Sequence, residues 1–306
     1  VDLPESKSYE SFKEYFEPSE TNYTDFLDEY GDTVKMMGAA PELDGAFELG
    51  EELAKRGIVA SVAHSSGNYD TAYESLNHGF SDITHIYNAC TSCYKEGVFR
   101  RAGTVEAALS DDRFSVQAIS DLVHLPVGVL RLIYKAKGSD KMYLITDGLE
   151  FSAFDMNEGE EFTQKNGVKV VYEDEVMKLA DRSCLAGSTA NGARLVRNMY
   201  KTVGVSLTEA VKMMTLTPAR VIGVDSYKGK IAEGYDADII LFDENCAFLE
   251  AKKLYKWVFD NIRLQKIADT TKIVTVIDVK LSLRTDHVRL VPANDVTALV
   301  PVGTDG

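Results

Sequence analysis

The sequence lacks the features that mark membrane, secreted and nucleic-acid-binding proteins. No apolar run approaches the ~18 residues that a membrane-spanning helix needs. The first residues, Val1–Glu5, are acidic and lack the basic and apolar regions of a signal peptide. With 33 Lys and Arg against 48 Asp and Glu, the formal net charge is -15, which disfavours nucleic acid and anionic membranes as partners. We therefore expect a cytoplasmic protein with neither nucleic-acid nor membrane partners.

Cysteine is also scarce, which excludes a disulfide framework. The four cysteines of this long chain are Cys90, Cys93, Cys184 and Cys246. Cys90 and Cys93 have the CxxC spacing of redox and zinc sites. However, the sequence contains no second CxxC and no nearby Cys/His pair that would complete a structural zinc site. We interpret the pair as two reduced thiols near a strand end.

Strand-like and helical segments alternate along most of the chain, whose composition is 45% apolar and 26% charged, as is ordinary for a globular enzyme. The expected strands are Thr33–Ala40, Ile58–Ala63, Asp82–Ile86, Ser115–Ser120, Met142–Thr146 and Cys184–Ala186. The expected helices are Asp44–Arg56, ended by Gly57, Asp70–Asn77, Val105–Ser110, Pro126–Ala136, Asn191–Val203 and Leu207–Met214, capped by Ser206. The strands are short, apolar and β-branched, as expected of strands buried on both faces.

This alternation predicts a parallel sheet with right-handed crossovers. A barrel of eight strand-helix units uses ~31 residues for each unit, and the strand ends are spaced at about that scale. The fold class is therefore α/β, a (β/α)8 TIM-type barrel over residues 1–225 that lacks its first units, since six are recognisable. After Pro218 come short β-rich runs, including Ile239–Phe242, Trp257–Phe259, Ile273–Val279 and Val288–Val291, which predict a small sandwich-like domain over 226–306.

Polar residues follow several of the expected strands, and a barrel would bring them to one rim. Glu42, His64 and His85 form a carboxylate and two imidazoles, a common ligand set for catalytic zinc that leaves one position for water. The metal lowers the pKa of that water. A single histidine at a strand end is more often structural. Three of the five histidines lie at strand ends, together with Glu42 and Asp147, and this favours a site.

Other residues at this rim have two interpretations each. Asp147 precedes Gly148, so it forms either a turn or a base that passes a proton from water to a leaving amine. His124 either positions the substrate or is a solvated loop residue. Arg100, beside Arg101, suits a phosphate but could equally pair with carboxylates. A phosphorylated ligand needs such a local cationic group in a protein this acidic.

Seven short motifs occur in an order that resembles the N-acetylglucosamine-6-phosphate deacetylases of the amidohydrolase superfamily. The resemblance covers roughly residues 30–245. The motifs are Ala39–Glu42 (AAPE), Gly57–Ser65 (GIVASVAHS), Thr84–Ala89 (THIYNA), Asp121–His124 (DLVH), Thr146–Gly148 (TDG), Leu185–Ser188 (LAGS) and Thr217–Gly223 (TPARVIG), with Gly229–Leu241 behind them. The ordered set is specific, whereas any single motif is weak.

The resemblance implies roles for five of these residues. Glu42, His64 and His85 would bind one divalent metal ion, with zinc expected before iron or cobalt. Asp147 would be the general base and acid, and His124 would contact the sugar and polarise its acetyl carbonyl. The reaction implied is removal of the acetyl group from N-acetylglucosamine-6-phosphate, which gives glucosamine-6-phosphate and acetate in amino-sugar catabolism.

The resemblance also implies a substrate pocket and an assembly. Asn88 and Ala89 would contact the phosphorylated sugar, and Arg100 would bind its phosphate from the neighbouring subunit of a homodimer. His124 would be a substrate-binding residue as well as a catalytic one.

The sequence also departs from the family pattern. The family begins with half of a β-sandwich and two barrel strands, the first able to carry a His-x-His metal motif. Nothing comparable precedes Glu42, so we expect a start near the third barrel unit and one metal rather than two. Cys90 replaces the usual methionine, and Leu149–Gly159 departs from the usual small-residue loop. The substrate is therefore less defined than the chemistry. Hydrolysis of a cyclic amide, deamination, and a non-catalytic sugar-binding role remain alternatives.

Overall fold

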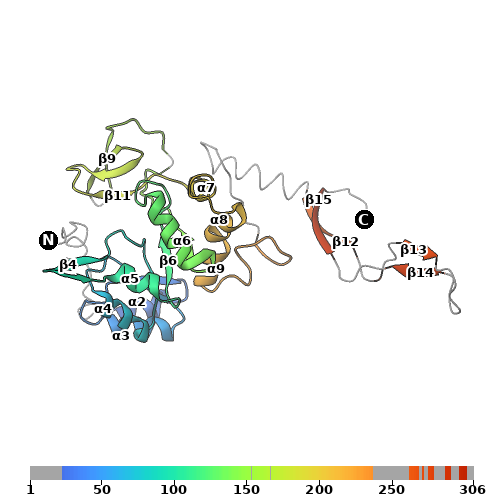
Figure 1. Cartoon of the computed structure of the whole chain (residues 1–306), viewed down its shortest axis with the longest axis horizontal. Coiled ribbons are helices and arrows are strands. Elements are labelled where there is room, and N and C mark those ends of the chain that lie inside the picture. Colours follow the sequence, from blue (N-terminus) through green and yellow to red (C-terminus); the bar gives the residue numbers. More distant parts are fainter. Residues whose placement is uncertain are drawn as a thin grey trace. The chain divides into compact units, whose positions relative to one another are not determined.

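The computed structural model describes residues 23–152, 154–165, 167–236, 262–268, 271, 275–278, 287–290 and 296–301. The chain divides into two compact units, Val1–Asp238 and Ile239–Gly306, and Figure 1 shows their elements coloured along the sequence. Among the described helices, none is both long and apolar enough to cross a membrane.

The first unit contains a five-stranded parallel sheet. Its strands lie in the order β1-β2-β3-β6-β7, and each neighbouring pair is parallel. The strands are β1 (Met36–Ala39), β2 (Val59–Val62), β3 (Phe80–Ile83), β6 (Ser115–Ala118) and β7 (Met142–Leu144). Because neighbours in the sheet also follow one another along the chain, the predicted α/β architecture with a parallel sheet is confirmed for these five strands.

Helices pack against this sheet, with α3 on β2 and β3, α6 on β6 and β7, and α8 on β7. The helices of the unit are α2 (Tyr23–Tyr30), α3 (Ala46–Lys55), α4 (Tyr69–Ser75), η2 (Leu76–His78), α5 (Thr104–Ser110), α6 (Val127–Lys141), α7 (Gly192–Asn198), the π-helix η3 (Met199–Val203), α8 (Leu207–Met214) and α9 (Leu216–Val221). Two predicted boundaries are confirmed. The Ser206 side chain caps α8 by accepting from the Glu209 amide, and Gly57, just after α3, has φ of 70°.

The two faces of the sheet differ in polarity because successive side chains of a strand point to opposite sides. Apolar residues on one face join the hydrophobic core with the helices, among them Val62, Ile83 and Leu144. Alternate positions carry polar side chains that are buried as well: Ser61, Asp82, Gln117 and Tyr143. The strands are buried on both faces as expected, but one of those faces is polar.

A four-stranded antiparallel sheet follows β7, in the order β11-β10-β9-β8. Its strands are β8 (Glu161–Thr163), β9 (Lys169–Glu173), β10 (Val176–Leu179) and β11 (Leu185–Ser188). The expectation that Cys184–Ala186 forms a sixth strand of the parallel sheet is wrong, because β11 pairs antiparallel with β10. Among the described residues, one isolated parallel bridge, between Gly148 and Ser188, connects the end of β11 to the segment after β7. The sequence did not predict this antiparallel sheet because its β9–β10 turn lacks the glycine that usually marks a two-residue hairpin turn. The turn is formed instead by Asp174 and Glu175, both at positive φ.

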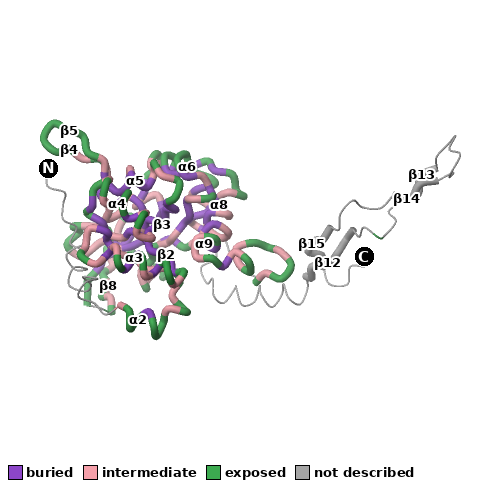
Figure 2. The backbone as a smooth tube through the Cα atoms, turned by 90° about the horizontal axis from the view of Figure 1, so that it is seen from below, coloured by how far each residue is buried: buried purple, intermediate pink, exposed green. Residues whose placement is uncertain are grey.

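The remaining strands that the structure describes form three antiparallel pairs. In the first unit, β4 (Tyr94–Glu96) pairs with β5 (Phe99–Arg101), and Figure 2 shows this exposed hairpin extending from the body of the unit. In the second unit, β12 pairs antiparallel with β15 and β13 with β14. The bounds are β12 (Ile262–Ala268), β13 (Thr275–Asp278), β14 (His287–Leu290) and β15 (Val296–Pro301). The expected segments Ile239–Phe242 and Trp257–Phe259 lie outside the described residues.

The packing of α3 on β3 depends on Gly50. A Cβ atom at this position would overlap the His78 carbonyl oxygen and the Phe80 ring. We expect Gly50→Ala to lower the free energy of unfolding by ~1–3 kcal/mol, although alanine favours helix by ~1 kcal/mol. Gly128→Ala in α6 is the matched control, because no atom lies within 4 Å of its added Cβ. Denaturant unfolding of both variants tests this, and a Gly50→Ala protein as stable as wild type would contradict it.

Candidate active site

Backbone strain is concentrated in the loops that follow the parallel strands. His64 after β2, His85 after β3 and Asp147 after β7 have φ values of 50°, 30° and 48°. Residues other than glycine rarely adopt this left-handed region, and such strain gathers at functional sites. Six of the nine described non-glycine residues with positive φ lie in these loops and the loop after β6: His64, His85, Tyr87, Ala89, Leu122 and Asp147. The strain supports a site at this edge of the sheet.

His64 and His85 face one another there. Their Nε2 atoms are 3.0 Å apart, and the ring planes meet at 70°. Nδ1 of His85 lies 3.0 Å from the Asn88 carbonyl oxygen, to which it donates. This hydrogen bond fixes the tautomer and leaves the lone pair on Nε2, as for a metal-binding histidine.

Electrostatics keep His64 neutral. Burial, and to a smaller extent the nearby His85, lower the pKa of His64 to about 4, while the carboxylate of Asp147 opposes the shift. A neutral imidazole has the lone pair that a metal requires. The influence of Asp147 on this ring also indicates that it lies close to the histidine pair, where its own side chain is exposed.

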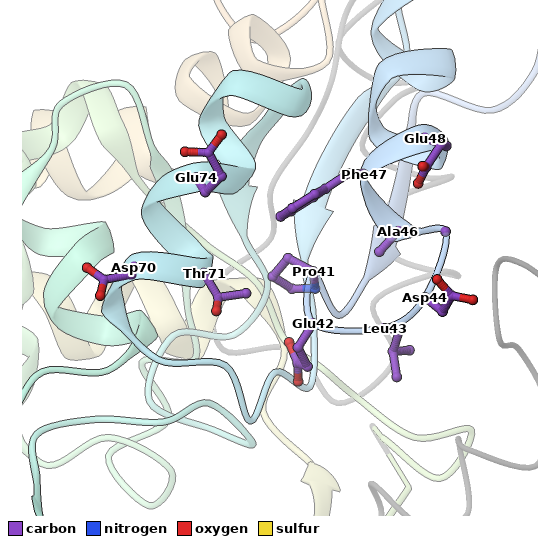
Figure 3. A pocket seen from close by; sticks show the side chains of 11 residues that line it. Pro41, Glu42, Leu43, Asp44, Ala46, Phe47, Glu48, Asp70, Thr71 and Glu74 are labelled. Atoms are coloured by element: carbon purple, nitrogen blue, oxygen red, sulfur yellow. The ribbon is translucent and has the colours of Figure 1, made fainter.

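Glu42 lies beside the loop that follows His64. Its Oε2 accepts from the Ser65 hydroxyl at 2.7 Å, and its Oε1 accepts from the Ser66 amide at 2.5 Å. Figure 3 shows Glu42 at the edge of a cavity of about 690 Å³. Four more carboxyl side chains line that cavity, namely Asp44, Glu48, Asp70 and Glu74. So many carboxylates do not suit a sugar phosphate, so we place the reaction on the histidine side of Glu42.

The histidine pair fits a bound cation. A tetrahedral zinc ion ~2.0–2.1 Å from both Nε2 atoms would separate them by about 3.3 Å, close to the observed 3.0 Å. Glu42 accepts hydrogen bonds from Ser65 and Ser66, and within the described residues no three His, Cys, Asp or Glu side chains form a group ready to hold a metal. The structure therefore brings His64 and His85 together, and the complete ligand set stays a prediction.

Asp121 orients His124 in the loop after β6. Nδ1 of His124 lies 2.7 Å from Asp121 Oδ2, and both side chains are almost fully buried. Oδ1 of Asp121 accepts from the amides of Val123 and His124. Burial acts to raise the pKa of Asp121, but the hydrogen bonds and charge of His124 and the two amide donors together lower it. The imidazole of His124 is thus anchored through Nδ1. The sequence alone did not reveal this anchoring role of Asp121, although the three-residue spacing was visible.

We expect Asp121→Asn to lower kcat about 10–100-fold with little change in KM, because an amide cannot hold His124 in this tautomer. Steady-state kinetics measures both constants. Asp111→Asn is the matched control, because Asp111 also accepts from an amide two residues ahead, that of Arg113, in the turn that leads into β6. If Asp111→Asn lowered kcat as much as Asp121→Asn, the role of Asp121 in orienting His124 would be contradicted.

The predicted substrate-binding residues are divided between two places. Asn88 lies next to the histidine pair, and its Nδ2 is 3.3 Å from the carbonyl oxygens of His85 and Ile86. Asn88 therefore shapes the His85 loop from both its backbone and its side chain, which the sequence did not reveal. Ala89 follows with φ of 47°. Arg100 lies on β5 and is exposed, and Figure 2 shows the hairpin of β4 and β5 extending from the body of the unit.

A parallel sheet with histidines and carboxylates at the carboxyl ends of its strands is the arrangement of α/β enzymes whose active sites lie at that edge. A model of the amidohydrolase family matches residues 119–279, more than half of the chain, including His124 and Asp147. The chain belongs to the amidohydrolase family.

Curated relatives refine this assignment. N-acetylglucosamine-6-phosphate deacetylases from Bacillus subtilis and Haemophilus influenzae are 30% and 31% identical, covering 76% and 80% of this chain but 57% and 62% of their own lengths. An N-acetylgalactosamine-6-phosphate deacetylase from Escherichia coli O157:H7 is 29% identical over 69% of this chain and 53% of its own length. The resemblance inferred from the motifs is confirmed, and the chain spans little more than half the length of the relatives it matches.

Solved structures of N-acetylglucosamine-6-phosphate deacetylases are also similar to this chain. An N-acetyl-D-glucosamine-6-phosphate deacetylase mutant from Mycobacterium smegmatis, in complex with N-acetyl-D-glucosamine-6-phosphate, aligns with a TM-score of 0.65 at 28% identity. It covers 73% of this chain and 57% of the other. The Pasteurella multocida N-acetylglucosamine-6-phosphate deacetylase gives 0.64 at 29% identity, covering 73% of this chain and 55% of the other.

Proposed function

We propose that this protein hydrolyses the N-acetyl group of an amino-sugar phosphate, with N-acetylglucosamine-6-phosphate as the substrate. The products are acetate and glucosamine-6-phosphate. The observation that carries the proposal is the contact of His64 and His85 at strained strand ends, close to Asp147. The similarity to deacetylases of this substrate supports the same reaction.

His64, His85 and Glu42 would hold one divalent ion, with zinc expected before iron or cobalt. When bound, such an ion supplies Lewis-acid polarisation and lowers the pKa of water. The hydrogen bond from His85 to the Asn88 carbonyl keeps the ring in the orientation that this requires.

Asp147 and His124 carry the proton chemistry in this proposal. The exposed carboxylate of Asp147 removes a proton from the attacking water and then delivers it to the nitrogen of the leaving amine. His124, anchored to Asp121, stabilises the charge that develops on the acetyl oxygen. Asn88 and Ala89 line the sugar position.

We also propose that the five parallel strands form part of the wall of a (β/α)8 barrel over residues 1–225, with a small sandwich-like domain over 226–306. The sequential strand order and the buried polar face support the barrel, whose interior that face would line. A homodimer fits the exposed position of Arg100, since a projecting hairpin can carry its guanidinium to the phosphate in a neighbouring subunit. The cytoplasmic location stays a prediction.

Acetate release from a panel of substrates tests the proposal. Zinc-loaded protein is offered N-acetylglucosamine-6-phosphate, N-acetylgalactosamine-6-phosphate, unphosphorylated N-acetylglucosamine and a cyclic amide. We expect the first to give the highest kcat/KM. A higher value for the galactosamine compound would reassign the sugar, since one relative is a deacetylase of that compound. Turnover of the cyclic amide alone, or of none of the four, would overturn the proposal.

A further inference from the structure

The polar face of the sheet contains a single buried carboxylate that joins four strands. Asp82 on β3 is fully buried. Its Oδ2 accepts from the Ser61 hydroxyl on β2 at 2.6 Å and from Gln117 Nε2 on β6 at 2.7 Å. Its Oδ1 accepts from the Tyr143 hydroxyl on β7 at 3.0 Å. The Asp82 carboxylate thus accepts hydrogen bonds from β2, β6 and β7. It lies in a buried region, where a polar group without a hydrogen-bond partner is costly.

These four strands lead to candidate catalytic residues. His64 comes three positions after Ser61, and His85 comes three positions after Asp82. Asp147 comes four positions after Tyr143, and the strand of Gln117 leads into the loop that holds His124. Shifting one strand relative to its neighbours would therefore shift one candidate catalytic side chain relative to the others.

A second hydrogen bond ties the network to the histidine pair itself. The Ser61 hydroxyl lies 2.7 Å from the Thr84 hydroxyl, and Thr84 is the residue directly before His85. Because Ser61 donates to Asp82, it accepts from Thr84. Ser61 thereby connects the carboxylate to both strands that end in histidine.

We propose that Asp82, acting through Ser61 and Tyr143, is a positioning residue that sets the spacing of His64, His85 and Asp147 at the strand ends. This inference rests on the proposed function, because it assigns the network to the same site. The network has two separable arms. The Ser61 arm controls the histidine pair, and the Tyr143 arm controls Asp147.

The protonation states suit this arrangement. Burial raises the pKa of Asp82 to about 6, with the bonds from Ser61, Gln117 and Tyr143 opposing the shift. Above that pH the carboxylate accepts all three hydrogen bonds. Burial raises the pKa of Tyr143 as well, so its hydroxyl remains a donor.

Two single-atom deletions, studied at pH 8, separate the arms. Ser61→Ala is expected to weaken zinc affinity about 10–100-fold, measured by competition with a chelator, and to change the visible spectrum of the cobalt-loaded protein. Tyr143→Phe is expected to leave both unchanged and to lower kcat about 10–100-fold, because a small displacement of a proton-transfer group is costly. The matched controls are Ser75→Ala, a buried serine in α4, and Tyr134→Phe in α6.

The outcomes are distinct from a failure of the deacetylase proposal. The positioning role would be overturned if Ser61→Ala and Tyr143→Phe changed zinc affinity and kcat equally. Wild-type zinc affinity and kcat in both variants would overturn it as well. If wild type releases no acetate, the deacetylase proposal fails, yet the Ser61→Ala affinity and cobalt spectrum still decide the positioning of the histidines. Thermal melting confirms that each variant is folded, and Tyr143→Phe keeps the inference testable if Ser61→Ala does not fold.

Discussion

Replacing Asp147 with asparagine is expected to lower kcat for acetate release by about 10²–10⁴-fold, the usual contribution of a general acid-base group. Asparagine has nearly the same shape but can neither take a proton from water nor return one to the amine. Because the residue's carbonyl accepts from the Ser188 amide through the backbone, the strained turn should survive the change. Zinc affinity should stay near wild type, so the loss would appear in kcat at full metal loading.

Asp112→Asn is the control for this variant. Asp112 is exposed in the turn that leads into β6, at the end of the strands opposite to Asp147. Wild-type kcat in Asp112→Asn and a large loss in Asp147→Asn would support the assignment. A variant of Asp147 that retains more than about a tenth of wild-type kcat would contradict a proton-transfer role.

The second large effect is expected from the histidine pair. We expect His85→Asn to reduce zinc affinity by more than the ~10–100-fold typical of residues behind the metal ligands, because it removes a ligand itself. Activity at micromolar zinc should disappear and return in part at higher zinc. Chelator competition gives the affinity, and activity over a zinc titration gives the recovery.

His78→Asn provides a matched control for that experiment. His78 stacks on Phe47 with ring centroids 4.2 Å apart and pairs with Glu51, outside the candidate site. The His78→Asn variant should change the free energy of unfolding and leave zinc affinity intact. If His78→Asn and His85→Asn weaken zinc binding equally, the metal does not lie between His64 and His85.

Periodicity was a good guide to the elements that place the site. Leu207–Met214 has the same bounds in sequence and structure, and the parallel strands were recognised from their apolar runs. The polar positions within those runs were missed. Ser61, Asp82, Gln117 and Tyr143 come from four different strands, so their convergence depends on strand order and register, which no local pattern encodes.

The site shows the same division between local and non-local information. The strand ends directed attention to His64, His85 and Asp147, since barrel strands carry function there. The orientation of the Glu42 carboxylate towards Ser65 and Ser66 was not predictable, because it depends on contacts across 23 and 24 positions of the chain. Asp121 was predictable in principle, being three residues before the histidine that it orients.

The most direct test is a crystal structure of the zinc-loaded protein with an anomalous map at the zinc edge. The account predicts one ion bound by Nε2 of His64, Nε2 of His85 and the carboxylate of Glu42, with Asp147 facing it. An ion bound elsewhere, or a zinc-loaded protein with no ion between the two Nε2 atoms, would contradict it.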